Sequence, residues 1–175
     1  MSRPSLVLAS ASPRRKDILR SMGIPFEVVS PGGDGPGVEG TPAEKVLAHA
    51  RWKAERVRTL TVDRAILAAD TLVFLNGRAL GKPTDSARAR AMLESLFDMT
   101  HEVWTGICMV SQDGEKAEAA HCASVNFSRP EEEDLAMYLR GGEWADKAGG
   151  YAIQGWAGRW ATVVEGEMET VVGLP

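Results

Sequence analysis

The chain has 175 residues, of which 44% are hydrophobic, 25% charged and 6% aromatic, and its formal net charge is −4. This length suits one domain, or one domain with two lobes, and the composition excludes a disordered or fibrous chain. The negative charge is unfavourable for binding a nucleic-acid polymer, which requires a basic face. Any anionic ligand must therefore be held by a local concentration of Lys and Arg.

Neither a membrane span nor a secretory signal is expected, because no apolar run is long enough and no cleavage site follows the N-terminal stretch. The two cysteines, Cys108 and Cys122, have no CxxC spacing. They predict reduced thiols in a cytoplasmic protein rather than a zinc site or a disulfide framework. The three histidines, His49, His101 and His121, are far apart in the sequence, and none makes a metal pair on its own.

The N-terminal half of the chain alternates short apolar strands with helices that begin at cap residues. In chain order we expect a strand at 6–9, a helix from Pro13 that Gly23 ends, a strand at 26–29, a mobile Gly- and Pro-rich loop at 30–40, a helix behind the Thr41–Glu44 capping box, and a strand at 65–69 that ends at Asp70 and Thr71.

The C-terminal half combines hairpins with two further helices. In chain order we expect a strand at 72–75, a turn at Asn76-Gly77, a return strand ending at Gly81-Lys82-Pro83, a helix from about Ser86, strands at 103–110 and 117–127, an acidic helix from Pro130 to Arg140, a loop at 146–155, and a last pair of strands at 160–164 and 169–172. Crossovers together with hairpins predict an α/β or α+β fold with one mixed sheet.

A first candidate site is the segment Ser10-Ala11-Ser12-Pro13-Arg14-Arg15, which joins a predicted strand to the start of a helix. Free backbone N–H groups and the helix dipole favour an anion there, and two hydroxyls and two guanidinium groups suit a phosphate. An ordinary surface helix capped by Ser12 explains the same residues.

A second candidate is Asp70-Thr71 at the end of an apolar strand, where active sites of α/β proteins usually lie. Such a carboxylate can accept a proton from water or bind a divalent metal, and it can equally be a turn residue. Lys82, aimed by its flanking Gly and Pro, and Lys53, on the helix after the capping box, can each supply a charge for a phosphate. Solvated lysines are the plainer explanation of both.

A third candidate is the glycine-rich segment 146–155, where backbone can approach a ligand closely. Its Gln154 offers a donor and an acceptor, as reading a base edge requires, although a tight irregular connection also fits. We expect Trp144, Trp156 and Trp160 to pack rather than to stack on a base. The chain has neither a P-loop motif nor a GxSxG nucleophile elbow.

The combination of these motifs is more specific than any one of them. Five segments in this order resemble the Maf family of nucleotide pyrophosphatases over nearly the whole chain: LASASPRR at 8–15, ADT at 69–71, GKP at 81–83, HEVWTG at 101–106 and DKAGGYAIQG at 146–155. The resemblance implies a single domain over residues 1–175, with an elongated mixed sheet between helices and two lobes around a central cleft, often as a homodimer.

The resemblance also implies an activity: hydrolysis of a nucleoside triphosphate to the monophosphate and pyrophosphate, with Mg²⁺ or Mn²⁺ as cofactor. By similarity Asp70 is the proton acceptor, and the phosphate site is lined by Ser10, Ser12, Arg15, Lys53 and Lys82. Arg14, Thr71 and Gln154 match the positions that separate the family's branches. Together they look like the branch that acts on dTTP and UTP, whereas the branch that acts on 7-methyl-GTP tends to have Trp, Gln and Glu.

Two departures from the family pattern leave the metal ligands unassigned. Family members often have an acidic pair in the loop after the second strand, but here Asp34 is followed by Gly35. Relatives also usually continue into a closing helix beyond the segment Gly173-Leu174-Pro175. Two alternatives stay open: a pyrophosphatase for modified nucleotides such as 7-methyl-GTP, and a nucleotide-binding regulator of cell division without turnover, which Gly35 favours.

Overall fold

The computed structural model describes residues 5–33, 35–61 and 63–175. Its strands are β1 (Leu6–Ala9), β2 (Phe26–Val28), β3 (Ala65–Leu75), β4 (Arg78–Leu80), β5 (Met99–Val110), β6 (Lys116–Phe127) and β7 (Ala161–Glu165). Its helices are α1 (Pro13–Ser21), α2 (Pro42–Arg58), α3 (Ser86–Leu96), α4 (Glu132–Gly141) and α5 (Met168–Val172), with short 3₁₀ turns η1 (Ala148–Gly150) and η2 (Trp156–Arg159).

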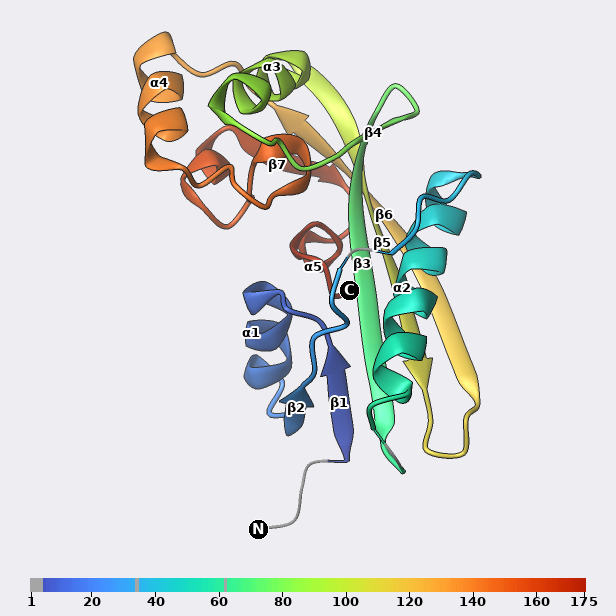
Figure 1. Cartoon of the computed structure of the whole chain (residues 1–175). Coiled ribbons are helices and arrows are strands. Elements are labelled where there is room, and N and C mark those ends of the chain that lie inside the picture. The colour runs from blue at the N-terminus through green and yellow to red at the C-terminus, as the bar shows by residue number, and fades with distance from the viewer. Residues whose placement is uncertain (1–4, 34, 62) are drawn as a thin grey trace. The chain divides into compact units, whose positions relative to one another are not determined.

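The strands of the described residues form one mixed sheet (Figure 1). Their hydrogen-bonded order is β2-β1-β3-β5-β6-β7, and β4 pairs with β3 beside this path. β1 is parallel to both β2 and β3, whereas β3 and β4, and likewise β6 and β7, are antiparallel. The prediction of a mixed α/β fold is confirmed.

The chain divides into two compact units, neither of which is a continuous segment. The first unit contains residues 1–70, 105–121 and 173–175, and the second contains residues 71–104 and 122–172. The strands β3, β5 and β6 each contribute residues to both units. Each unit has an apolar core of its own.

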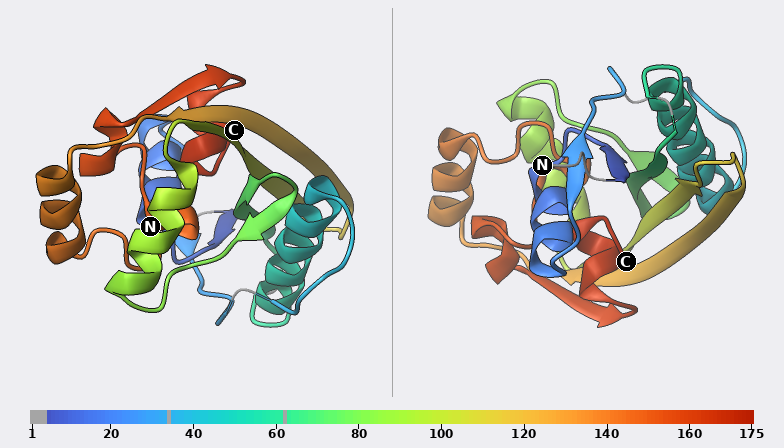
Figure 2. Two further views of the ribbon diagram at one scale, coloured as in Figure 1. Left: turned by 90° about the horizontal axis from the view of Figure 1, so that it is seen from above. Right: turned by 90° about the horizontal axis from the view of Figure 1, so that it is seen from below.

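In the first unit, α1 and α2 cover opposite faces of the strands (Figures 1 and 2). Val7 and Ile66 belong to the cluster that holds the apolar face of α2, while Leu8 belongs to the cluster that holds Leu19 of α1. Because successive side chains of a strand point to opposite faces, Asp70 lies on the α2 face, two residues after buried Ala68. By the same alternation Ser10, two residues after Leu8, follows the α1 face.

The second unit is built around an aromatic cluster from β6, α4 and the segment between α4 and β7, and the apolar face of α3 packs against this cluster. Phe127 contacts the rings of Tyr151 and Trp160, and Trp156 stacks on Tyr138 with ring centroids 6.0 Å apart. Trp144 also packs against this cluster. The prediction that the tryptophans serve packing is confirmed.

The cap and turn predictions are confirmed at most element boundaries. Thr41 and Glu44 form the complete capping box of α2. Asn76 and Gly77 both have positive φ, 50° and 75°, as the tight hairpin between β3 and β4 requires. Ser12 stands at the predicted N-cap of α1, but its side chain makes no capping hydrogen bond.

One predicted strand is wrong. Residues 169–172 form part of the short helix α5 rather than the partner of β7. β7 instead pairs with β6, with Val163 opposite Val125. An apolar run of four residues is too short for its period to separate a strand from a helical turn, and this explains the error.

Two further predictions concern membranes and thiols. Within the described ranges, no helix combines the length and apolar character needed to cross a membrane. Cys108 is buried and Cys122 is half-buried, and both are free thiols, as predicted.

Candidate active site

Asp70 stands inside a strand rather than at its end, which corrects the sequence prediction. β3 continues from Ala65 to Leu75 without a break. The parallel neighbour β1 ends at Ala9, which is opposite Ala68 of β3. The strand beside Asp70 has therefore ended before it, and the chain there has turned toward α1.

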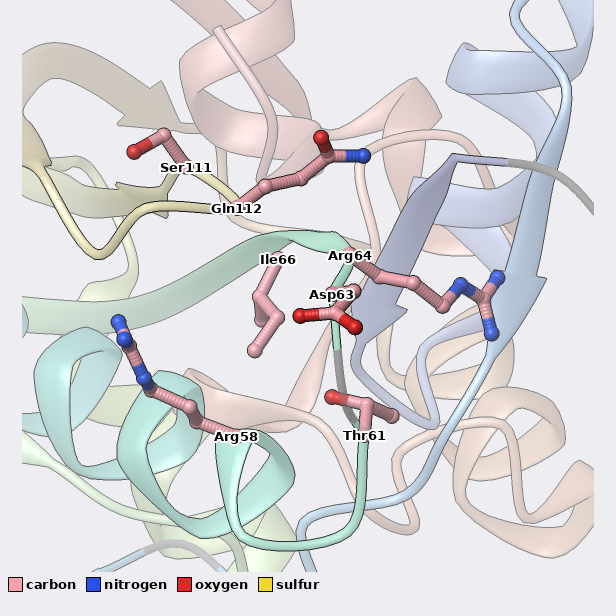
Figure 3. Close-up of a pocket in the computed structure, with 7 residues that line it drawn as sticks. All are labelled: Arg58, Thr61, Asp63, Arg64, Ile66, Ser111 and Gln112. Carbon is pink, nitrogen blue, oxygen red and sulfur yellow. The ribbon is translucent and has the colours of Figure 1, made fainter.

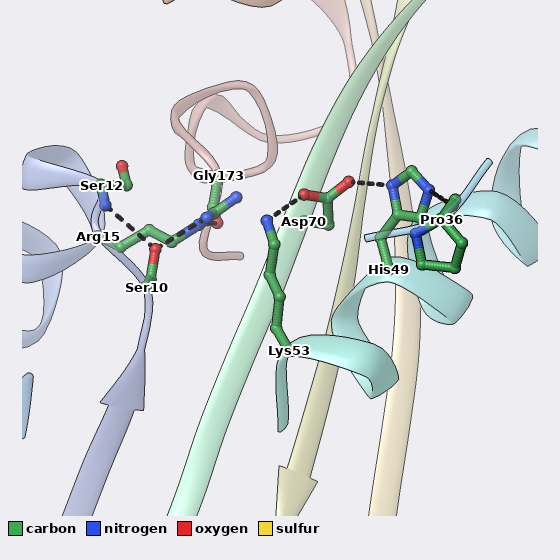
Figure 4. Close-up of polar contacts among 8 residues, drawn as sticks. All are labelled: Ser10, Ser12, Arg15, Pro36, His49, Lys53, Asp70 and Gly173. Carbon is green, nitrogen blue, oxygen red and sulfur yellow. Dashed lines mark hydrogen bonds and ion pairs between the residues drawn. The ribbon is translucent and has the colours of Figure 1, made fainter. Parts of the chain in front are cut away.

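Both carboxylate oxygens of Asp70 face side chains of α2 (Figure 4). Lys53 Nζ lies 2.5 Å from Oδ1, and His49 Nδ1 lies 2.9 Å from Oδ2. Asp70 and Lys53 are each only 6% exposed. The two contacts come from one face of the helix, because residues 49 and 53 are four apart.

The electrostatics of the cluster keep Asp70 ionised. Burial alone would raise the pKa of Asp70, but the hydrogen bond from His49 and the positive charges of Lys53 and Arg15 outweigh it and lower that pKa. The same hydrogen bond raises the pKa of His49, against the opposing effect of its partial burial. The site thus holds one carboxylate among three basic side chains.

A second cluster of polar residues lies at the junction of β1 and α1, beside the Asp70 carboxylate (Figure 4). Arg15 is buried and donates from Nε to the Gly173 carbonyl at 2.7 Å and from Nη1 to Ser10 Oγ at 3.0 Å. The backbone N–H of Ser12 also donates to Ser10 Oγ, at 3.2 Å. Arg14, on the first turn of α1, is half-buried, and its desolvation lowers its pKa.

Five of the eight predicted substrate-binding residues belong with Asp70 to the first unit: Ser10, Ser12, Arg14, Arg15 and Lys53. Thr71, Lys82 and Gln154 belong to the second unit. Thr71 follows Asp70 along β3, and Lys82 and Gln154 are exposed. Asp34, the remaining acidic residue of the expected pair, lies outside the described residues.

His49 is the residue that sequence reasoning missed. Besides Asp70, its ring contacts the Pro36 carbonyl oxygen, 3.1 Å from Nε2. The available signal was the spacing of four between His49 and Lys53, which places both side chains on one helix face. The other two histidines, His101 and His121, lie far from His49 in the sequence, so no His-His spacing marks it.

The described residues do not fit a resident metal ion. They contain no group of three or more His, Cys, Asp and Glu side chains arranged to hold one. The carboxylate of Asp70 is already paired with Lys53 and His49. We therefore assign no metal ligand among the described residues.

A pocket at the other end of the first unit does not gather its arginines around one ligand (Figure 3). It has a volume of about 280 Å³ and lies between the end of α2, the start of β3 and the turn after β5. The guanidinium groups of Arg58 and Arg64 point away from each other in Figure 3. Arg64 is also paired with Glu27 at 2.9 Å, so the two arginines do not converge on one ligand.

Comparison with known proteins identifies relatives over nearly the whole chain. The family model described as Maf-like protein matches residues 5–175. A protein of Deinococcus radiodurans named dTTP/UTP pyrophosphatase is 40% identical over 98% of this chain and 88% of its own length. A protein of the same name from Pelotomaculum thermopropionicum is 41% identical over 97% of this chain and 90% of its own length.

A solved structure supports the fold independently of these sequences. The Ham1 protein of Staphylococcus aureus superposes with a TM-score of 0.51 over 70% of this chain and 71% of its own. Its sequence identity is 17%, so the likeness concerns the fold alone. The expected fold and the expected family are both confirmed.

Proposed function

Because the chain belongs to the Maf-like protein family, we propose that it hydrolyses dTTP and UTP to the nucleoside monophosphate and pyrophosphate. The carrying observation is the buried, ionised Asp70 among Lys53, His49 and Arg15. Relatives at about 40% identity bear the name dTTP/UTP pyrophosphatase, which supports the same activity and the same substrates. We propose that both units serve one catalytic domain.

The basic residues of the first unit account for binding of the triphosphate. Lys53 and Arg15 are charges held in place by burial, and Arg14 adds a third beside the start of α1. Ser10 and Ser12, with the N–H groups of that helix terminus, supply further donors for phosphate oxygens. Thr71, Lys82 and Gln154 complete the proposed substrate contacts, with Gln154 reading the base.

Asp70 is the proposed general base. A water molecule attacks the α-phosphorus, its proton passes to an Asp70 oxygen, and the bond to the bridging oxygen breaks so that pyrophosphate leaves. In the structure one oxygen contacts Lys53 and the other contacts His49, and these contacts weaken Asp70 as a base. An entering triphosphate competes for Lys53, and loss of that contact strengthens the carboxylate as a proton acceptor.

Mg²⁺ or Mn²⁺ belongs in this proposal to the substrate. A divalent cation travels with a triphosphate and is bound largely through the phosphate oxygens. When bound, it offsets charge on the triphosphate and on the departing pyrophosphate. The protein residues orient the phosphates and the water, so that most of the lowered barrier comes from positioning and electrostatics.

The test is pyrophosphate release from dTTP, UTP, CTP, GTP and 7-methyl-GTP, measured with Mg²⁺ and with Mn²⁺. Fast release from dTTP and UTP, and slow release from the others, is the expected result. Preference for 7-methyl-GTP or another purine would overturn the substrate assignment. Tight binding of dTTP with no release from any nucleotide would replace the enzyme with a nucleotide-binding regulator.

A further inference from the structure

The imidazole of His49 lies between two oxygens that can only accept hydrogen bonds. Its Nδ1 is 2.9 Å from Asp70 Oδ2, and its Nε2 is 3.1 Å from the carbonyl oxygen of Pro36 (Figure 4). An ionised carboxylate and a backbone carbonyl both lack a proton to donate. Each ring nitrogen must therefore carry hydrogen for both contacts to be hydrogen bonds.

A neutral imidazole cannot satisfy this arrangement. It has one N–H and one lone pair, so either tautomer would direct a lone pair at an oxygen about 3 Å away. The imidazolium ion has two N–H groups and satisfies both contacts. Asp70 does not relieve the conflict by taking the proton itself, because Lys53 holds its other oxygen at 2.5 Å.

We propose that His49, as an imidazolium ion, is a positioning residue that orients Asp70 for catalysis and ties the loop carrying Pro36 to the active site. This inference rests on the proposed function for its catalytic part. The loop joins β2 to α2, and its glycines at 32, 33, 35 and 40 all have positive φ, so it has little regular structure of its own. His49 supplies a fixed point on the helix for this segment.

The groups that act on His49 come from three elements. Asp70 of β3 favours the charged ring, and the hydrogen bond to Pro36 of the loop does the same. Lys53, on the same helix, opposes the charge, as does the partial burial of the ring. The net effect raises the pKa of His49, in agreement with the geometry.

The direction of the pH effect follows from this. His49 is charged below its raised pKa, and the bridge between Asp70 and the loop is lost as the pH rises through that value. Turnover of dTTP by the wild-type enzyme is therefore expected to decline on the alkaline side, with an inflection that belongs to His49.

The first test is nuclear magnetic resonance of the ¹⁵N-labelled full chain without nucleotide. The chain has three histidines, so the variants His49→Gln, His101→Gln and His121→Gln assign every ring. Two protonated ring nitrogens for His49 at about pH 7, above the ordinary histidine pKa of about 6.5, are expected. A single neutral tautomer at that pH would overturn the proposal, whatever the enzyme does to nucleotides.

The second test is the pH profile of dTTP turnover in His49→Gln and His49→Leu, with His121→Gln as the exposed control. His49→Gln keeps a donor toward Asp70 but does not titrate, so its profile should lack the alkaline inflection. We expect kcat to fall about 10-fold in this variant at neutral pH, and further in His49→Leu, which has no donor. KM should change less, because Lys53 and the arginines remain.

These outcomes separate the proposal from the function on which it rests. Circular dichroism establishes that each variant is folded before its kinetics are compared. Wild-type turnover combined with unchanged pH profiles in His49→Gln would overturn the role of His49 and leave the pyrophosphatase intact. Absence of wild-type turnover would overturn the function, while the resonance measurement would still decide the charge of His49.

Discussion

His49 in the first unit and His101 in the second differ in what surrounds their rings. His49 is half-buried and lies between a carboxylate and a carbonyl oxygen. His101 is 2% exposed, its Nε2 is 2.6 Å from the hydroxyl of Tyr151, and among the described residues its Nδ1 has no hydrogen-bond partner. Burial lowers the pKa of His101 to about 4, whereas the bond to Asp70 raises that of His49.

The difference shows that a partner's charge, rather than the depth of burial alone, decides the state of a histidine. A phenol can donate to or accept from a neutral ring, so His101 stays uncharged and serves packing beside Phe127 and Tyr151. An ionised carboxylate requires a hydrogen-bond donor and stabilises a positive charge on the ring that donates, so His49 belongs to the chemistry of the site.

Asp70→Asn should have the largest effect, because it removes both the proposed base and the partner that charges His49. We expect turnover of dTTP to fall by about 10³-fold, within the range usual for loss of a general base. Nucleotide binding should persist, because the basic side chains remain and the negative charge of the Asp70 carboxylate no longer competes with the phosphates for them.

Pyrophosphate release and titration calorimetry measure the two quantities separately. The matched control is Asp113→Asn, which changes an exposed carboxylate in the turn between β5 and β6. Near-normal turnover in Asp70→Asn would mean that another group takes the proton.

His101→Gln should flatten the pH dependence of stability on the acid side. The folded-state pKa of His101 lies below its unfolded value of about 6.5, so the unfolded chain binds the proton first as the pH falls. The wild type should therefore lose ~3 kcal/mol from this group between about pH 6.5 and 4. Urea denaturation of the variant and the wild type across that pH range measures the free energy of unfolding of each. The difference between them is the contribution of His101, because the carboxylates are the same in both proteins.

His49 contributes to stability with the opposite sign. Its folded-state pKa is raised, so its contribution is complete below the unfolded value and is lost as the pH rises through the folded one. For the His101 prediction, the slope of the free energy of unfolding against pH is the deciding quantity. If this slope is equal in the wild type and in His101→Gln on the acid side, folding does not lower the pKa of His101, and the ring becomes charged in the folded protein.

Tyr151→Phe should reduce stability without disturbing the packing of the ring. The substitution removes the hydroxyl that bonds His101 Nε2 and leaves both nitrogens of that buried ring without a partner among the described residues. A loss of about 1–2 kcal/mol in the free energy of unfolding is expected, as for other buried hydrogen bonds. A variant as stable as the wild type would mean that the imidazole finds water in place of the phenol.

Ser12→Ala should have the smallest effect on stability, because its side chain makes no capping bond to α1. We expect a change within about 0.5 kcal/mol, together with a higher KM for dTTP from the lost phosphate contact. The matched variant Thr41→Ala removes a cap that is formed, and should cost about 1 kcal/mol. Equal losses in the two variants would contradict the assignment of Ser12 to substrate rather than to the helix.

The sequence supported good predictions wherever a local rule determined the outcome. The Thr41–Glu44 box, the Asn76-Gly77 turn and the apolar runs of β1 and β3 depend on neighbouring residues and were placed correctly. The order of motifs identified the family. The end of β1 beside a continuing β3 was not predictable, because it depends on the pairing of strands far apart in the chain.

Contacts between distant segments were also beyond local rules. The bond from Arg15 to the Gly173 carbonyl joins residues 158 positions apart. The pairing of His49 with Asp70 needs both the face of α2 and the alternation of β3 to be known. The prediction of a strand at residues 169–172, which lie in α5, was wrong for a local reason. Four residues are too few for their apolar pattern to distinguish a helix from a strand.

The discontinuous first unit has a consequence for the newly made chain. Leu174 is buried beside Leu8, Leu19 and Ala69, and the Gly173 carbonyl accepts from Arg15. During translation, residues 1–70 are made before residues 105–121, which are translated within the second unit, and before residues 173–175, which follow it, an interval of several seconds at ordinary elongation rates. The nascent site must therefore remain unfinished, with apolar surface uncovered, until translation has passed residue 174, and this interval is when a chaperone would be most useful.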